Sequence, residues 1–136
     1  MRYLKTYKLF ESIDNNIKLN IEDILLELEE DKGLQVDIKD MNYYKDGINP
    51  TDCLRVYIKD NQDRFFRLED IMDVLLRIKE YLKESDYSID IGNFVIHDPF
   101  CSVDDYLDID NFMEEFSGEE LYNINIFIYN NPRISF

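Results

Sequence analysis

Hydrophobic residues recur along this chain with two periods, one typical of helices and one typical of strands. Apolar side chains return every three or four positions in residues 20–32 and again in residues 68–84. Asn20 is a suitable N-cap for the first segment, and Gly33 follows its last apolar positions. The pattern therefore predicts two amphipathic helices. The second is the better defined, because one apolar stripe runs its whole length between acidic residues at its start and lysines near its end.

Apolar and polar residues alternate in the segments between and after these helices, which is the pattern of half-buried strands. The predicted strands cover residues 34–38, 54–58, 64–67, 87–96 and 121–129. Residues 60–63 have the composition of a hairpin turn, and Gly92 with Asn93 predicts a bulge or bend. Because the alternation gives each strand one apolar and one polar face, we expect an antiparallel sheet with one covered face and one solvated face.

These elements predict an α+β fold, a two-layer sandwich with a mostly antiparallel sheet of four to five strands and two main helices on one face. The two helices open on similar sequences, at residues 21–24 and 68–71, and strands follow both. This similarity suggests an αββ-αββ pseudo-repeat, close to a circularly permuted ferredoxin-like sandwich. We expect a single α+β domain over residues 19–136, preceded by an N-terminal helical segment at residues 1–18.

The composition supports a real core and offers little to a cofactor. Apolar residues make up 45% of the 136 residues, and no apolar run is long enough to cross a bilayer, so we expect a soluble, intracellular protein. Cys53 and Cys101 lack Cys-x-x-Cys spacing, which argues against a zinc site or a disulfide framework. The four glycines are scattered, so no phosphate-binding loop is expected, and we expect no cofactor.

The negative charge is concentrated in one part of the chain. The formal net charge is −15, and residues 84–132 contain twelve acids and no Lys or Arg. Such a stretch repels nucleic acid and anionic membranes, whereas it attracts a basic protein partner. The acids that form the candidate interaction surface are Asp104, Asp105, Asp108, Asp110, Glu114, Glu115, Glu119 and Glu120. Apolar residues interleaved with them predict a short acidic amphipathic helix near residues 109–117.

Two segments could carry chemistry. His97 lies four residues before Cys101, so a Cys-His nucleophile is conceivable, but Pro99 favours an extended or turn conformation and nothing forces the two side chains together. Residues 104–110 are rich in oxygen ligands for calcium, yet the glycine that an EF-hand loop needs at its sixth position is missing. We therefore expect no metal site and no enzyme.

The N-terminal segment is the one locally basic part of the chain. Tyr3, Tyr7 and Phe10 recur at helical spacing among lysines and an arginine. The pattern KTYKLFE, at residues 5–11, resembles the capsid-targeting segments of internal head proteins of large contractile-tailed phages. The resemblance implies cleavage after Glu11 by a prohead protease that recognises Leu9, Phe10 and Glu11.

Cleavage there would release a chain that begins at Ser12. The resemblance also implies a location in the cytoplasm of an infected bacterial host or in the virion. The alternative is that the aromatic residues of this segment dock a helix on the domain. The same tripeptide pattern also recurs inside the predicted helices, for example at Leu25 to Glu27 and at Leu82 to Glu84.

The leading hypothesis from the sequence is a noncatalytic phage protein, a virion or prohead accessory that acts by protein binding. A second hypothesis is an acidic inhibitor that presents carboxylates in place of DNA phosphates to a basic host or defence protein. A third is a small module that dimerises through an exposed sheet face with Tyr57, Phe127 and Tyr129.

Overall fold

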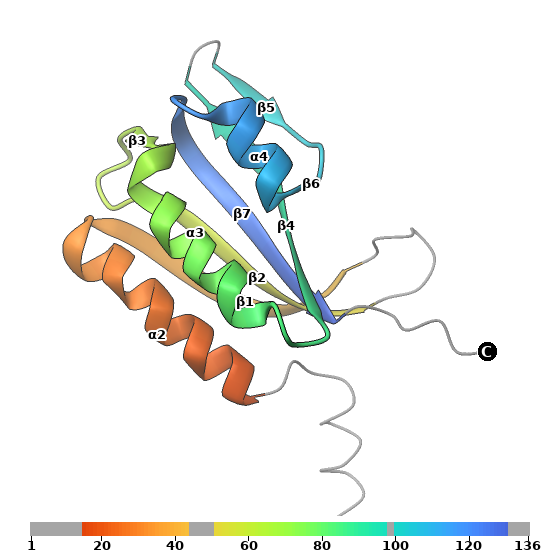
Figure 1. The fold of residues 1–136 in the computed structure, drawn as a ribbon. Helices are drawn as coiled ribbons and strands as arrows, with labels where there is room; N and C mark the ends of the chain where they lie inside the picture. The colour runs from red at the N-terminus through yellow and green to blue at the C-terminus, as the bar shows by residue number, and fades with distance from the viewer. Residues whose placement is uncertain (1–14, 44–50, 98–99, 131–136) are drawn as a thin grey trace, which may run out of the picture.

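The computed structural model describes residues 15–43, 51–97 and 100–130, which form three helices and seven strands (Figure 1). In chain order these elements are α2 (Asn15–Asp31), β1 (Leu34–Tyr43), β2 (Thr51–Asp60), β3 (Phe66–Arg67), α3 (Leu68–Leu82), β4 (Tyr87–Ile96), β5 (Cys101–Val103), β6 (Leu107–Asp108), α4 (Ile109–Phe116) and β7 (Glu120–Asn130). The α+β class predicted from the sequence is confirmed.

All strand pairs in the described sheet are antiparallel, and the main path has the order β1-β2-β7-β4-β5. The two-residue strands β3 and β6 add to β7 and β4, so the sheet has more strands than the four to five expected. In the order β1-β2-β7-β4, strand β7 lies between β2 and β4, the two long strands that are connected through α3. This is the order of a ferredoxin-like sandwich whose first strand has moved to the end of the chain. The sequence repeat itself stays a prediction.

The three helices cover one face of the sheet, and the main core lies between the two layers (Figure 1). Alternate strand residues such as Val56 of β2, Ile91 of β4 and Ile126 of β7 point into this core and are fully buried. The apolar stripe of α3, including Leu75 and Ile78, packs onto them. Each such side chain contributes roughly 1.5–3 kcal/mol when it leaves water, so the predicted alternation is what holds the layers together.

Helix α2 extends further toward the N-terminus than predicted. Asn20 is not an N-cap, because α2 already includes Asn15, and its side chain instead donates to the Tyr81 hydroxyl of α3 at 2.7 Å. The expected domain boundary after residue 18 therefore lies inside this helix. The predicted end is right, since Gly33 follows the helix with φ 66°, a conformation that favours glycine.

The other predicted helices fit the structure closely. Helix α3 begins at Leu68 as predicted and ends at Leu82, two residues early. Helix α4 matches the short acidic helix predicted near residues 109–117. Asp108 caps α4, because its carboxylate accepts from the Asn111 backbone N–H at 2.8 Å. The turn at residues 60–63 is confirmed, with Asp63 at φ 57°. It is not a hairpin turn, because the strand that follows it, β3, pairs with β7 and not with β2.

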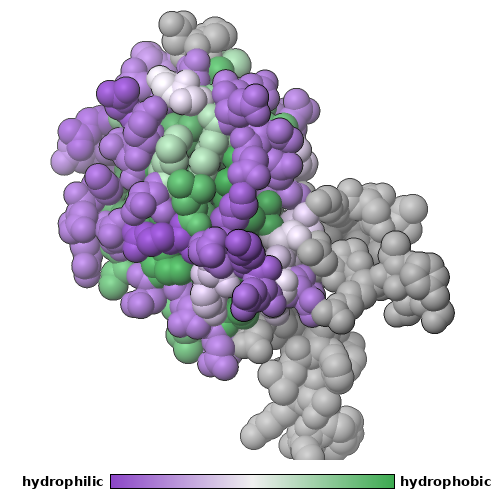
Figure 2. Space-filling view, in the orientation of Figure 1, coloured by the Kyte–Doolittle hydropathy of each residue, from purple (hydrophilic) through white to green (hydrophobic). Residues whose placement is uncertain are grey.

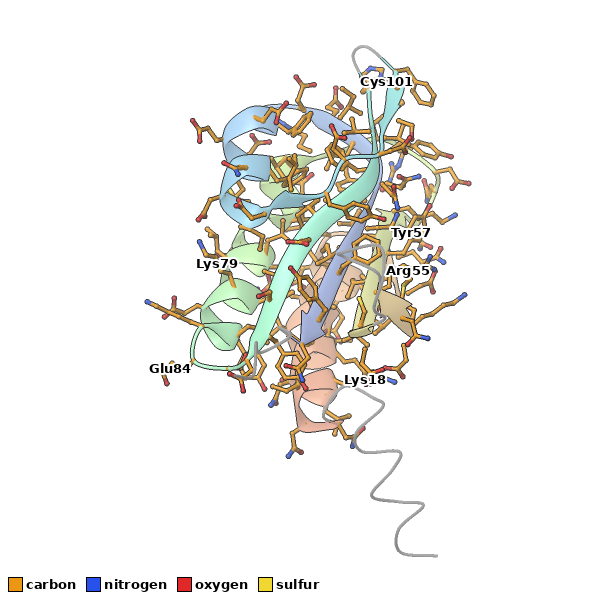
Figure 3. All side chains as sticks on the ribbon, turned by 90° about the vertical axis from the view of Figure 1, so that its right-hand side faces the viewer. Lys18, Arg55, Tyr57, Lys79, Glu84 and Cys101 are labelled. Carbon is orange, nitrogen blue, oxygen red and sulfur yellow. The ribbon has the colours of Figure 1, made fainter. Side chains whose placement is uncertain are left out.

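The sheet face away from the helices is only partly solvated. Arg55 and Tyr57 lie on this face (Figure 3), and both are half-buried. Phe127 and Tyr129 were predicted to be exposed here, and this prediction is wrong. They are buried together with Cys53 in a second, smaller apolar cluster. The alternation identified the face of each residue correctly, but it carried no information about what packs over that face.

A bulge in β4 shapes the same face. The register between β4 and β7 shifts between Gly92 and Val95, and Asn93 has φ 48°, which confirms the predicted bend. A β-carbon at Gly92 would collide with the ring of Tyr106, which packs edge-on to Phe127 at a centroid distance of 5.3 Å. Glycine here lets the aromatic ring lie flat against the strand.

Candidate functional site

Charged groups are paired unevenly across the described residues. Most of the salt bridges lie in the half of the molecule built from α2, β1, β2 and α3, for example Arg77 to Glu27 at 2.6 Å and Lys18 to Asp40 at 3.2 Å. Among the described acids after residue 83, Asp110 pairs with Lys79 of α3 at 2.6 Å. Because residues 84–132 contain no Lys or Arg, a cation that pairs with an acid of this stretch must come from another part of the chain, as Lys79 does.

Helix α4 presents part of this charge on a firm base. Its apolar side, with Phe112 and Phe116, packs edge-on against Phe94 of β4 at centroid distances of 5.0 and 4.8 Å. Its opposite side exposes Glu114 and Glu115. Because the aromatic cluster fixes the helix on the sheet, the backbone positions from which these two side chains project are fixed on the surface.

The predicted acidic residues divide into two groups in the structure. Some have structural roles: Asp108 caps α4, Asp110 pairs with Lys79, and half-buried Glu119 accepts from the Leu68 backbone N–H through its own carbonyl at 3.2 Å. The others are exposed and form no salt bridge among the described residues. We call these others the α4 acidic surface: Asp104, Asp105, Glu114, Glu115 and Glu120.

The surface around α4 is shaped as well as charged. A shallow hollow of about 600 Å³ is lined by Leu107, Asn111, Glu114 and Glu115. Figure 2 shows that hydrophilic residues cover most of the helix-bearing face, with a hydrophobic strip between them. A partner approaching from this side therefore meets mainly polar and charged groups.

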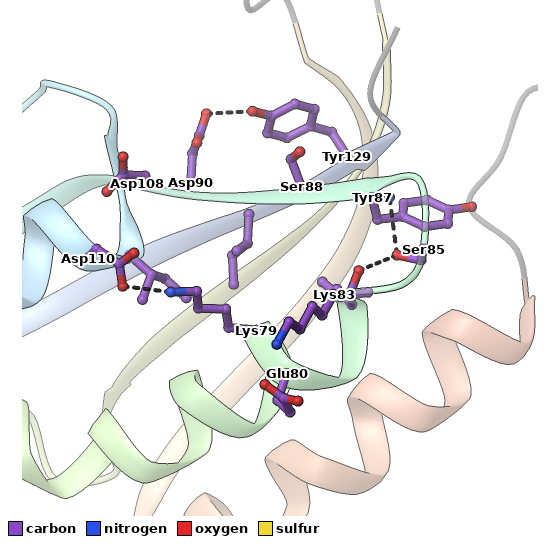
Figure 4. A pocket seen from close by; sticks show the side chains of 13 residues that line it. Lys79, Glu80, Lys83, Ser85, Tyr87, Ser88, Asp90, Asp108, Asp110 and Tyr129 are labelled. Carbon is purple, nitrogen blue, oxygen red and sulfur yellow. Dashed lines mark hydrogen bonds and ion pairs between the residues drawn. The ribbon is translucent and has the colours of Figure 1, made fainter. Parts of the chain in front are cut away.

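A second cavity, of about 640 Å³, opens between the end of α3, the first half of β4 and the start of α4 (Figure 4). Its polar groups are largely bonded to one another. Lys79 pairs with Asp110, and the Tyr129 hydroxyl donates to buried Asp90 at 3.0 Å. Ser85 donates to the Leu82 carbonyl at 2.7 Å and accepts from the backbone N–H of the strand that follows. These bonds link α3 to α4, β7 to β4, and the end of α3 to the start of β4, and they leave few groups for a ligand.

Sequence reasoning did not identify Asp90 as a special residue. It sits in an alternating strand like any other polar position, and only the pairing of β4 with β7 brings the Tyr129 hydroxyl to it. Because Tyr129 was predicted to be exposed, no pattern in the sequence pointed to this contact.

The two residues considered for nucleophilic catalysis, His97 and Cys101, lie directly after β4 and at the start of β5. The His97 ring stacks on Phe65 at a centroid distance of 4.0 Å, and Cys101 is exposed in the hairpin opposite Ile96. No hydrogen bond joins His97 to Cys101 within the described part of the chain. Burial raises the pKa of the Cys53 thiol to about 12, so at neutral pH this group is not a thiolate.

The remaining predictions on sites are addressed only in part. Leu9, Phe10 and Glu11 lie outside the described residues. Within residues 15–43, 51–97 and 100–130, no group of three or more His, Cys, Asp or Glu side chains is placed to hold a metal ion. None of the described helices is both long and apolar enough to span a membrane.

Comparisons with known proteins do not identify a relative. No protein-family model, no curated protein and no solved structure matches this chain.

Proposed function

We propose that this chain is a noncatalytic phage protein, associated with the virion or the prohead, that acts by binding another protein through the α4 acidic surface. The observation that supports the binding role is the set of exposed acids around α4 that form no salt bridge among the described residues. Charge left uncompensated on a rigid element attracts a basic partner over a distance and steers its approach at low ionic strength.

The partner proposed is a basic protein surface. Glu114 and Glu115 project from a helix held by buried aromatic rings, so their backbone positions are set before binding and binding need order only their side chains. The hollow beside them can admit a long cationic side chain such as arginine or lysine, with Leu107 supplying an apolar wall for its stem.

The phage context rests on the resemblance of residues 5–11 to capsid-targeting segments. In mature particles we expect a chain that begins at Ser12. Mass spectrometry of purified virions tests this part separately, because recovery of only the intact N-terminus would remove the processing proposal without affecting the binding surface.

The alternative function, an acidic inhibitor that takes the place of DNA on a basic protein, would use the same surface. The stretch of residues 84–132 without Lys or Arg favours it. An inhibitor of this kind occupies the DNA-binding site of its target, so added DNA should displace it from that target.

The binding proposal is tested by quantitative affinity capture from infected cells at two salt concentrations. The variant Glu114→Gln/Glu115→Gln removes two charges from α4, and Glu29→Gln/Glu30→Gln removes two charges from adjacent exposed glutamates of α2 as a matched control. We expect a partner that is retained by the wild type and the α2 control, is lost from the α4 variant, and is released by added salt. Equal retention by both variants would contradict the proposal.

A further inference from the structure

Strand β1 is a long edge of the sheet. Its ten residues pair with β2 along one side, and no described strand pairs with its other side. An edge of this length offers a row of backbone donors and acceptors to another strand.

The hydrogen-bond pattern of β1 can be worked out from one bond. The Asn61 N–H donates to the Gly33 carbonyl at 3.1 Å, and these residues continue the β1-β2 register by one step. Because bonded and non-bonded pairs alternate in an antiparallel ladder, the backbone groups of Val36, Ile38 and Asp40 point away from β2. With Leu34 and Asn42 at the two ends of the strand, these residues carry the unused edge.

The side chains beside this edge are charged with both signs. Asp37 and Lys39 are exposed on the sheet face away from the helices. Lys39 lies directly opposite Arg55 of β2, so two cations face each other across the strands, and the buried Nε of Arg55 has no hydrogen-bond partner within the described residues. Like charges in this position are unfavourable, so a nearby carboxylate would relieve the pair.

We propose that two copies of this chain pair through their β1 edges, antiparallel, with Ile38 on the twofold axis. In this register Asp37 of each copy lies opposite Lys39 of the other, which gives two cross-strand pairs of opposite charge and places a carboxylate beside Lys39, on the side away from Arg55. Val36 lies opposite Asp40, and Ile38 packs against its own copy. The interface is isologous, and it joins the two sheets into one.

Neighbouring registers are worse for a stated reason. If the β1 strand of one copy slid by one residue along the β1 strand of the other, the apolar face of one sheet would lie beside the polar face of the other. With the axis at residue 37, Asp37 would face its own copy, and with the axis at residue 39, Lys39 would do so. Both arrangements bring like charges directly opposite each other, which leaves the register centred on Ile38.

Analytical ultracentrifugation of charge-reversed variants tests this pairing. We expect the wild type to dimerise, and Asp37→Lys and Lys39→Glu each to weaken dimerisation by about tenfold or more, because each replaces two attractions by two repulsions. An equimolar mixture of the two variants should form heterodimers, since each repulsive pair becomes attractive again. The double variant Asp37→Lys/Lys39→Glu should dimerise like the wild type. Lys83→Glu is the control, because it reverses the charge of an exposed residue outside β1, and it should leave the dimerisation constant unchanged.

Hydrogen exchange followed by NMR gives an independent readout. On dimerisation the amides of Val36, Ile38 and Asp40 should become protected, whereas those of Gln35 and Asp37 are bonded to β2 and should be protected in either state. A wild type that stays monomeric up to about 1 mM would overturn the proposal. A dimer that leaves the Ile38 amide unprotected, or a mixture of the two variants that fails to associate, would overturn it as well. The outcome is separate from that of the proposed function, because Glu114→Gln/Glu115→Gln leaves β1 unchanged.

Discussion

Removal of the Tyr129 hydroxyl tests the buried polar contact between β7 and β4. The hydroxyl donates to the Asp90 carboxylate at 3.0 Å, and both side chains are buried. A hydrogen bond to a carboxylate contributes roughly 1.5–3 kcal/mol. Because Asp90 has further interactions in the structure, it is not left bare in the variant, so we expect the low end of that range. Tyr129→Phe should therefore lower the free energy of unfolding by about 1.5 kcal/mol, which for a chain of this size lowers Tm by roughly 5 °C.

Urea denaturation at neutral pH measures this change. Tyr57→Phe is the matched control, because Tyr57 lies on the same sheet face, is half-buried and makes no hydrogen bond through its hydroxyl within the described residues. It should shift the free energy of unfolding by less than about 0.5 kcal/mol. Equal effects of the two substitutions would refute the reasoning, since they would show that the Tyr129 hydroxyl contributes no more than an unbonded one.

Three further predictions concern single residues. The Gln62 backbone N–H and Arg64 hold the pKa of the Asp60 carboxyl below its usual range, so Asp60 contributes stability that is present above the unfolded-state pKa and is lost as pH falls through the folded-state pKa. When Tm is measured as a function of pH, Asp60→Asn should therefore lose less Tm in acid than the wild type. An identical loss of Tm in the two proteins would contradict this prediction. Gly92→Ala should displace the Tyr106 ring from Phe127 and cost about 1 kcal/mol in denaturation, and the cost should largely disappear in a Tyr106→Ala background. An aromatic disulfide reagent should label exposed Cys101 in the native protein and should label Cys53 only after unfolding, because burial raises the pKa of the Cys53 thiol to about 12. Rapid labelling of both thiols in the native protein would disagree with the structure.

The two proposed surfaces lie at opposite sides of the molecule. Strand β1 is at one end of the strand order, whereas α4 contacts β4 and β6 near the other end. A dimer joined through β1 would therefore present its two α4 acidic surfaces at its far ends. Such an assembly could bridge two basic sites, and its binding to a repeated surface would exceed that of a single copy.

Local patterns were enough to predict most of the elements. The periodicity of residues 68–84 located α3 to within two residues of its end, and the interleaved acids and apolar residues located α4, because both signals lie within a few turns of chain. Asn20 misled the prediction of the start of α2, since a good N-cap residue can equally occupy a helix interior and bond to a neighbouring helix.

The candidate sites could be predicted only as a list of acids. Asp108, Asp110, Glu114 and Glu115 are close in the sequence, but one caps a helix, one pairs with Lys79 from a distant helix, and two are exposed without a salt bridge among the described residues. The difference depends on residues far away in the chain, so no local pattern could show it.

What the sequence determined by itself is therefore the three helices and the long strands, the apolar face of each, and the placement of negative charge in the C-terminal half, whereas the short strands β5 and β6 were not predicted. These follow from interactions between residues that are near neighbours. The tertiary structure alone decided the strand order, the burial of Phe127 and Tyr129, and the open edge of β1, because each depends on which distant strand packs beside another.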